Sequence, residues 1–274
     1  MQGQIQPEAR SAPPVYVGID VCKAHLDIHF HPLGDCLRFA NDREGIKRLK
    51  RRMAAHEVAL VVIEATAKYH RLAHRSLDQS GFAVAIVNPL RSRLFAEAIG
   101  TRAKTDRVDA RMLAILGEAL TPQATPPAPQ ALEALQELVH ARMAATREHT
   151  ALANRRASCQ TSFLRGELTR RLKSTDTHIA RLAKEIASRI DADPVLARRY
   201  AILLSIPSIG PAVAAVLIAD LPELGRLDRH AIACLAGLAP FADDSGDTTG
   251  PRHIKGGRAM PRQALYWAAL SASR

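Results

Sequence analysis

Two short apolar segments of the sequence each end in a carboxylate. Residues 15–20 (Val-Tyr-Val-Gly-Ile-Asp) end at Asp20, and residues 58–64 (Val-Ala-Leu-Val-Val-Ile-Glu) end at Glu64. β-Branched apolar runs of this length are typical of buried strands. An acid at the end of a strand is often only a turn residue. Two matched acids instead predict carboxylates gathered at one edge of a sheet, where they can bind a metal ion.

Two further acids, Asp106 and Asp109, follow Thr105. They lie three residues apart at the start of a predicted helix over 106–120, so they share one helix face. Four carboxylates suit Mg²⁺ or Mn²⁺ rather than zinc. Two such ions can hold the attacking and leaving oxygens of a phosphoryl displacement. The alternative is four unrelated surface acids.

The segments around these acids predict an α/β domain over residues 15–120. Strands are expected at 15–20, 24–30, 36–40, 58–64 and 82–87, with helices at about 44–55, 68–80, 89–100 and 106–120. The order β-β-β-α-β-α-β-α, in which the last α covers the two successive helices, predicts a mixed sheet with helices on it, in the order of the RNase H-like fold. In that fold the acids end the first and fourth strands and begin the last helix.

The remaining segments predict a helical second half. Residues 1–14 read as a disordered leader, and residues 121–130 form a Pro-rich linker. Residues 131–192 carry an apolar stripe typical of a coiled coil or helical hairpin, whose use would be self-association. Residues 193–274 predict a small, mostly helical domain. Within it, Gly210 precedes Pro211 in a turn like that of a helix-hairpin-helix, where a helix N-terminus can meet a phosphate. A simple turn between helices is the alternative.

A polar, glycine-rich loop over residues 237–258 contains Ser245. A serine in such a loop is usually a turn residue, and the sequence alone assigns it no catalytic role. Basic side chains follow the loop and also precede Asp106. The residues that we expect to contact nucleic acid are Arg102, Lys104, Gly210, His253, Lys255, Arg258 and Arg262.

The charge balance favours a polyanionic partner. The chain has 38 Lys and Arg against 27 Asp and Glu, a formal net charge of +11 and a pI near 10.0. Nucleic acid fits this balance better than a membrane, because no apolar run is long enough to span a bilayer. Aromatic residues make up 4% of the chain, which argues against a platform that stacks single-stranded bases. Four scattered cysteines and the lack of a signal peptide indicate a reduced, cytoplasmic protein.

Three blocks of residues resemble the DEDD transposases of bacterial insertion sequences, the class of bridge-RNA-guided recombinases. The first block is Gly18-Ile-Asp20-Val-Cys-Lys23. The second comprises Glu64-Ala-Thr, Asn88-Pro and Lys104-Thr-Asp-Arg-Val-Asp-Ala110. The third comprises Ile206-Pro-Ser-Ile-Gly-Pro211, Gly237-Leu-Ala-Pro240, Ser245-Gly246, Gly250, Ile254, Gly256-Gly-Arg258 and Leu265-Tyr266. The resemblance covers residues 15–274.

The resemblance implies a RuvC-like domain that holds Mg²⁺ on Asp20, Glu64, Asp106 and Asp109. It implies that Ser245 is a nucleophile that forms a covalent phosphoserine intermediate with DNA, followed by strand exchange between donor and target. An RNA carried by the element would choose the sites by base pairing. The helical segment would join protomers into a dimer or tetramer, and the active sites would be assembled across subunits.

The sequence departs from the family at two places. After Glu64-Ala-Thr the family usually has glycine, whereas this chain has Ala67. The chain also ends at Arg274, where relatives generally continue with a basic helical stretch. Two other functions remain open at this point. One is a metal-dependent Holliday-junction resolvase or nuclease without a covalent serine, and the other is a non-catalytic nucleic-acid-binding remnant of a transposase.

Overall fold

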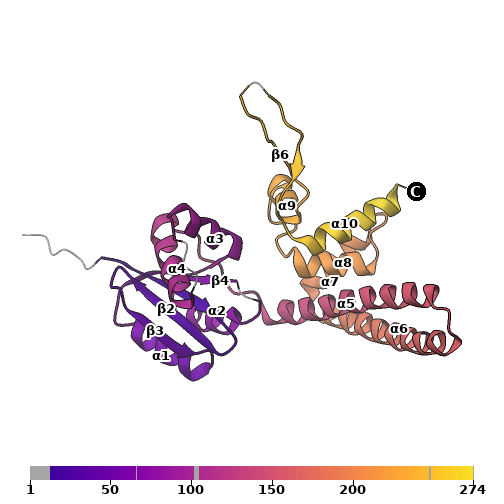
Figure 1. Cartoon of the computed structure of the whole chain (residues 1–274), viewed down its shortest axis with the longest axis horizontal. Coiled ribbons are helices and arrows are strands. Elements are labelled where there is room, and N and C mark those ends of the chain that lie inside the picture. Colours follow the sequence, from indigo (N-terminus) through magenta and orange to yellow (C-terminus); the bar gives the residue numbers. More distant parts are fainter. Residues whose placement is uncertain (1–12, 66, 102–104, 247, 274) are drawn as a thin grey trace, which may run out of the picture. The chain divides into compact units, whose positions relative to one another are not determined.

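The structure, a computed structural model, describes residues 13–65, 67–101, 105–246 and 248–273 (Figure 1). The chain divides into two compact units between Pro127 and Ala128. Most of the predicted leader, residues 1–12, lies outside the described residues.

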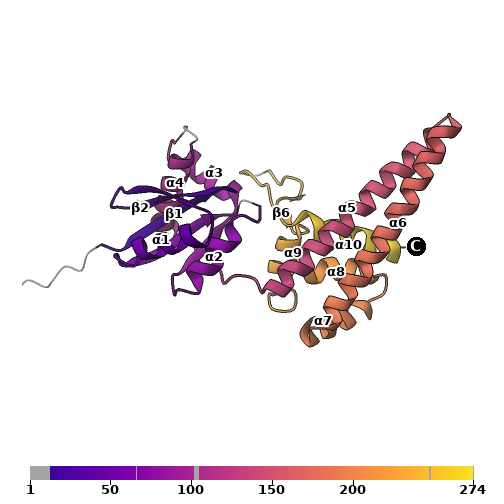
Figure 2. The same ribbon diagram turned by 90° about the horizontal axis from the view of Figure 1, so that it is seen from below.

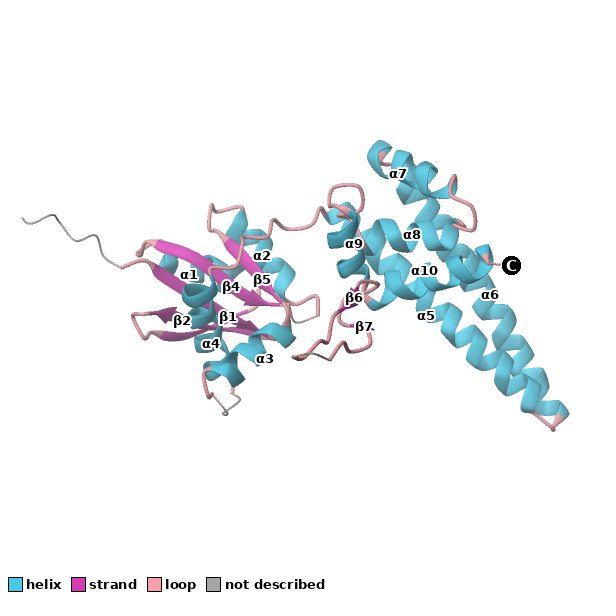
Figure 3. Ribbon diagram, turned by 90° about the horizontal axis from the view of Figure 1, so that it is seen from above, coloured by secondary structure: helices cyan, strands magenta, loops and turns pink. Residues whose placement is uncertain are grey.

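The first unit contains a five-stranded mixed sheet (Figure 3). Its strands are β1 (Val15–Val21), β2 (His25–His31), β3 (Cys36–Ala40), β4 (Val58–Glu64) and β5 (Val84–Val87), in the order β3-β2-β1-β4-β5. β2 is antiparallel to both β1 and β3, whereas β4 is parallel to both β1 and β5. The predicted mixed α/β class is therefore confirmed for this unit.

Four helices cover the two faces of this sheet. They are α1 (Arg43–Met53), α2 (His70–Asp78), α3 (Pro89–Ala98) and α4 (Asp106–Leu120). Val17 and Ile19 of β1 belong to a core that includes Leu49 of α1 and Leu77 of α2. Tyr16 of β1 packs in the core with residues of α3 and α4. Because side chains alternate along a strand, the even-numbered residues of β1, including Asp20, face α4.

The second unit is dominated by helices. Helices α5 (Gln130–Ser158) and α6 (Ser162–Asp191) form a long hairpin and lie side by side (Figures 1 and 2). Shorter helices pack near one end of the hairpin: α7 (Pro194–Leu204), α8 (Pro211–Asp220), α9 (Arg229–Ala236) and α10 (Ala259–Ala272). Their core joins Leu135, Ile190 and the nearly fully buried helix α8.

Three features of the second half were not predicted. Helix α9 is one of them, and it is capped by Asp228, whose side chain accepts hydrogen bonds from the N–H groups of His230 and Ala231. The other two are the strands β6 (Pro240–Phe241) and β7 (His253–Ile254), which pair antiparallel at the base of the loop that carries Ser245. Strands of two residues show no alternation, so they leave no signal in the sequence.

Within the part of the chain that the structure describes, none of the helices combines the length and apolarity needed to cross a membrane.

Candidate functional site

A glycine on β1 brings α4 close to the sheet. A Cβ placed on Gly18 would lie 2.0 Å from the carbonyl oxygen of Ala110 and 2.4 Å from the amide nitrogen of Ala114. Both atoms belong to the backbone of α4, so no side chain can move aside. Gly18 and Asp20 face the same side of the sheet, and Asp109 precedes Ala110. The absent side chain therefore lets the Asp109 turn of the helix approach the end of β1.

Three of the four predicted acids line one groove. Asp20, Glu64 and Asp109 share it with α3, which contributes Arg93 and Glu97, and with the start of the loop that follows α3. Burial is the largest cause that raises the pKa of Asp20 to about 6, and the charge of Asp109 is the next. Glu64 and Asp106 raise the same pKa further, whereas a hydrogen bond from the Val21 N–H lowers it. The negative charges therefore interact, and the groove favours positive charge.

A buried serine holds one carboxylate of this groove. The Ser92 hydroxyl on α3 donates a hydrogen bond to Glu64 Oε2, at 2.5 Å. Helix α3 is positioned by Asn88, whose side chain accepts from the Leu90 N–H, and by Pro89 at the first helical position. No sequence pattern singles out Ser92, because the contact joins residues 28 positions apart.

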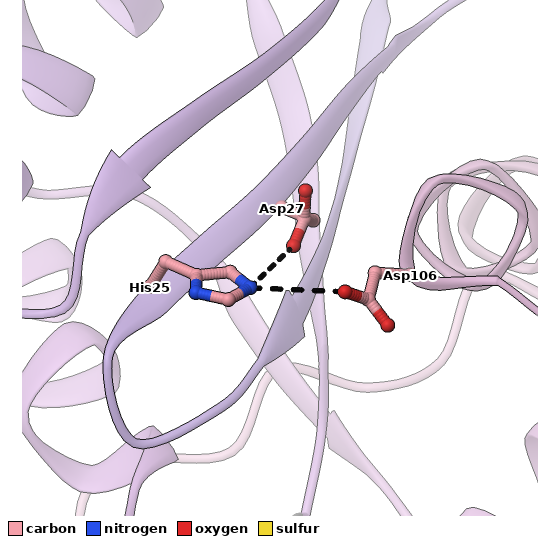
Figure 4. Close-up of side chains that lie close together, drawn as sticks. All are labelled: His25, Asp27 and Asp106. Carbon is pink, nitrogen blue, oxygen red and sulfur yellow. Dashed lines mark ion pairs between the residues drawn. The ribbon is translucent and has the colours of Figure 1, made fainter.

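The fourth acid, Asp106, is held on a different side of the helix start. Its Oδ2 lies 3.1 Å from Arg38 Nη2 and 3.7 Å from His25 Nε2. Arg38 also binds both oxygens of the buried Asp27, at 2.8 and 2.9 Å. Figure 4 shows His25, Asp27 and Asp106 converging from a strand and a helix. Asp106 thus lines a second pocket with Asp27 and Arg38 rather than the groove of the other three acids.

The groove of Asp20, Glu64 and Asp109 fits a hard divalent cation. Its acidic donors are carboxylate oxygens, the ligands that such ions prefer, and the charges of Asp109 and Glu64 add to burial in raising the pKa of Asp20. The His25, Asp27 and Asp106 group also places its ligand atoms within 4.8 Å of one another. Arg38 already supplies a cation to that group, however, so it fits a metal less well.

Ser245 lies in the second unit, on the exposed loop between β6 and β7. Its N–H donates to Thr248 O at 3.1 Å, and the Thr248 N–H returns a bond to Ser245 O at 3.0 Å. Gly246 follows with φ of 55°. This tight turn presents the serine side chain to solvent. The loop extends away from α9 in Figure 1.

Several of the predicted nucleic-acid contacts are engaged within the protein. Arg258 binds the two carboxylate oxygens of Glu223 at 2.6 and 2.7 Å, and Arg262 donates to Gly256 O at 2.8 Å. Lys255 lies 3.4 Å from Asp243 Oδ2. The bonds of Arg258 and Arg262 fix the segment between β7 and α10.

The other predicted contacts differ in setting. His253 is exposed on β7 and pairs with Phe241. Gly210 caps α8 with φ of −85°, and a Cβ there would meet nothing within 4 Å. Arg102 and Lys104 lie outside the described residues.

Comparison with known proteins identifies the family. Residues 17–164 match the family model of the IS110-type DEDD transposases, described as "Transposase". Residues 200–274 match a second model, described as "Transposase IS116/IS110/IS902 family". The chain belongs to the IS110 family of transposases. This membership supports an enzyme that acts on DNA as a transposase or recombinase, and it suggests a dependence on divalent metal.

Two curated relatives of this IS110-family chain have the same name. Each is a "Pilin gene-inverting protein", one from Moraxella bovis and one from Moraxella lacunata. Each is 28% identical over 273 residues, which cover 94% of this chain and 83% of the relative.

The residues around the acids that the sequence pattern did not predict are Gly18, Asp27, Arg38 and Ser92. Each acts on one of the acids, through packing, charge or a hydrogen bond. The alternation in His-Leu-Asp-Ile-His-Phe-His over β2 was a usable signal, because it places His25 and Asp27 on the face that carries Asp20.

Proposed function

We propose that this protein is a metal-dependent DNA recombinase that exchanges strands through a covalent serine intermediate. The observation that carries the proposal is the groove lined by Asp20, Glu64 and Asp109 in a chain of the IS110 family. The order β3-β2-β1-β4-β5, with acids at the ends of β1 and β4, supports an RNase H or RuvC-like fold. The names of the two relatives support recombination, since inverting a gene requires that cut strands be rejoined.

The acids would hold Mg²⁺ or Mn²⁺. Asp20, Glu64 and Asp109 supply the oxygens, and Ser92 keeps the Glu64 carboxylate oriented. When bound, the ion supplies charge neutralisation of a DNA phosphate and polarisation of its P–O bond. Asp106 stands one helical turn before Asp109 and is the remaining candidate ligand.

Ser245 is the proposed nucleophile. Its Oγ would lose its proton and form a bond to phosphorus while the bond from phosphorus to one sugar oxygen breaks, and that oxygen would take up a proton. The phosphorus stays in a diester, now bound to serine in place of one sugar. A sugar hydroxyl of another strand can therefore displace the serine and rejoin the DNA. The exposure of Ser245 on a tight turn supports this role.

An RNA of the element is the proposed guide. The net charge of +11 and the small aromatic fraction suit a protein that contacts nucleic-acid backbones and leaves base reading to pairing. The long hairpin of α5 and α6 is the proposed contact between protomers. Phe163 and Leu164 near its tip are 78% and 48% exposed, which supports an apolar contact there.

A trapping experiment tests the catalytic proposal. The protein is purified with RNA from its own element, mixed with Mg²⁺ and labelled DNA that spans the element junction, and then denatured. We expect a protease-sensitive protein–DNA adduct that is lost in Ser245→Ala and in Asp20→Asn. The matched control is Thr249→Ala, which alters an exposed hydroxyl of the same loop and should retain the adduct.

The other outcomes separate the alternatives. Metal-dependent cleavage without an adduct, unchanged in Ser245→Ala, would assign the groove to a resolvase or nuclease that uses water. Binding without cleavage would indicate a non-catalytic remnant. An adduct that forms without added RNA would refute guidance while keeping the serine mechanism.

A further inference from the structure

The strongest unassigned feature is the contact between Arg38 and Asp106. Arg38 lies on β3, and its guanidinium bridges two carboxylates on different elements. Nε and Nη2 bind the two oxygens of Asp27, and Nη2 also binds Asp106. The charges of Asp27 and Asp106 both raise the pKa of Arg38, after the larger effect of the Asp27 hydrogen bond. One cation therefore serves two acids.

The two halves of this bridge differ in burial. The Asp27 side chain is 7% exposed, whereas that of Asp106 is 57% exposed. A buried carboxylate that loses its partner is strongly destabilised, whereas an exposed ion pair contributes little. The bond from Arg38 to Asp27 is thus the fixed half of the bridge, and the bond to Asp106 is the half that can break.

We propose that Arg38 is a positioning residue that holds Asp106 away from the groove of Asp20, Glu64 and Asp109, so that Arg38 and a divalent ion compete for this carboxylate. Asp106 contacts Arg38 and His25 through the same oxygen, Oδ2. Asp106 lies outside the lining of that groove and lines the pocket of Asp27 and Arg38 instead. Asp106 joins the other three acids when it leaves Arg38.

This inference rests on the proposed function, since it requires that the groove bind a divalent ion. Its direct measure is the affinity of the full chain for Mn²⁺, followed by calorimetry. In Arg38→Ala, Asp106 no longer has the competing guanidinium, and only the longer contact with His25 is left. We expect Mn²⁺ to bind up to about fivefold more tightly, the factor that corresponds to the loss of one exposed ion pair.

A double-mutant cycle separates competition from simple charge. Removing any nearby cation strengthens Mn²⁺ binding because it removes an electrostatic repulsion, and this effect does not depend on Asp106. Under competition, Arg38→Ala has less effect in the Asp106→Asn background than in the parent protein. Equal effects in the two backgrounds would overturn the proposal. Arg107→Ala, which removes the next charge on α4, should have the same effect in both backgrounds.

Two further measurements cover the cases in which a variant does not fold or binds Mn²⁺ too weakly. If Arg38→Ala does not fold because Asp27 lies unpaired, Arg38→Lys retains a cation for Asp27 and replaces it in the cycle. If Asp106→Asn binds Mn²⁺ too weakly to measure, a crystal structure with Mn²⁺ decides. We expect the separation of Arg38 Nη2 and Asp106 Oδ2 to lengthen beyond hydrogen-bond distance. A contact that stays near 3.1 Å with the ion bound would overturn the proposal.

The Asp20→Asn variant distinguishes a failure of the proposed metal groove from a failure of the proposed competition by Arg38. If the parent protein binds no Mn²⁺, or binds it equally well in Asp20→Asn, the proposed metal groove is wrong. If Asp20→Asn weakens binding while the cycle shows no coupling, only the competition by Arg38 is wrong.

Discussion

Gly18 lies directly against the backbone of Ala110, at a distance that leaves no room for a Cβ. This contact sets how closely α4 approaches β1, and with it the distance between Asp109 and Asp20. We expect Gly18→Ala to lower the free energy of unfolding by about 3 kcal/mol or more, because two backbone segments must separate. Chemical denaturation of the full chain measures the loss.

A glycine in open space provides the control for that substitution. A Cβ added to Gly166 of α6 would meet no atom within 4 Å outside the neighbouring backbone of its own helix. Gly166→Ala should stabilise its helix by about 1 kcal/mol, because alanine is the better helix former. A Gly18→Ala protein as stable as the parent would contradict the close packing of α4 on β1.

The raised pKa of Asp20 predicts a pH-dependent stability of the metal-free protein. The folded value is about 6, above the ordinary 3.8, so the folded state holds the Asp20 proton more tightly. The contribution of Asp20 to stability is therefore fully present below about pH 3.8 and is lost as the pH rises through about 6. A shift of this size corresponds to at most about 3 kcal/mol, and solvent around the half-buried group reduces it.

Asp20→Asn removes this pH dependence. At pH 7 and without metal, the variant should be more stable than the parent, by about 1–2 kcal/mol after screening. At pH 4 the two should be nearly equal. Thermal melts across this range measure the difference, and a variant that is less stable at pH 7 would show that Asp20 is not repelled by its neighbours.

Ser92 should affect the metal through Glu64. In Ser92→Ala the Glu64 carboxylate loses a donor that orients it, and we expect Mn²⁺ affinity to fall about tenfold, as for other partners of metal ligands. Ser80→Ala is the matched control, since Ser80 Oγ donates only to the backbone oxygen of Ser76 among the described contacts. Unchanged Mn²⁺ binding in Ser92→Ala would show that Glu64 is not a metal ligand or that Ser92 does not orient it.

Ala67 adopts a left-handed conformation, with φ of 43°. This is the position at which the resemblance leads one to expect glycine. Ala67→Gly should stabilise the protein by about 0.5–1 kcal/mol, because glycine takes this conformation without a steric penalty. Ala65→Gly is the nearby control with the opposite expected sign. A destabilised Ala67→Gly protein would show that the left-handed turn is not strained.

Gly210 offers a test of nucleic-acid contact that spares the fold. Because an added side chain meets nothing there, Gly210→Asp and Gly210→Asn should both fold, and either side chain can cap α8. If the start of α8 meets a phosphate, the aspartate should weaken DNA binding about fivefold more than the asparagine, through charge repulsion. Equal affinities of the two variants would place the phosphate elsewhere.

The local pattern of the sequence predicted the sheet, because long apolar runs and helix caps are local signals of the strands and helices that contain them. β4 and α4 begin and end as expected. The roles of Arg38 and Ser92 could not be predicted, because each depends on a contact between distant segments whose packing sets the distance. The same limit applies to Asp106, whose helix position predicted a place beside Asp109 but not its bond to Arg38.

The hairpin that carries Ser245 is closed by two residue pairs, Pro240 with Ile254 and Phe241 with His253. Its described ion pairs, such as Arg252 with Asp244, are exposed and contribute little. A segment held this weakly opens at low free-energy cost, so its amide hydrogens should exchange much faster than those of β1. Fixing the backbone of each loop residue on DNA would cost about 1–2 kcal/mol of conformational entropy, which reduces the free energy gained from contacts. With the proposed role of Ser245, the loop would adapt to DNA junctions of different shape, and it would bind each of them more weakly than a rigid loop.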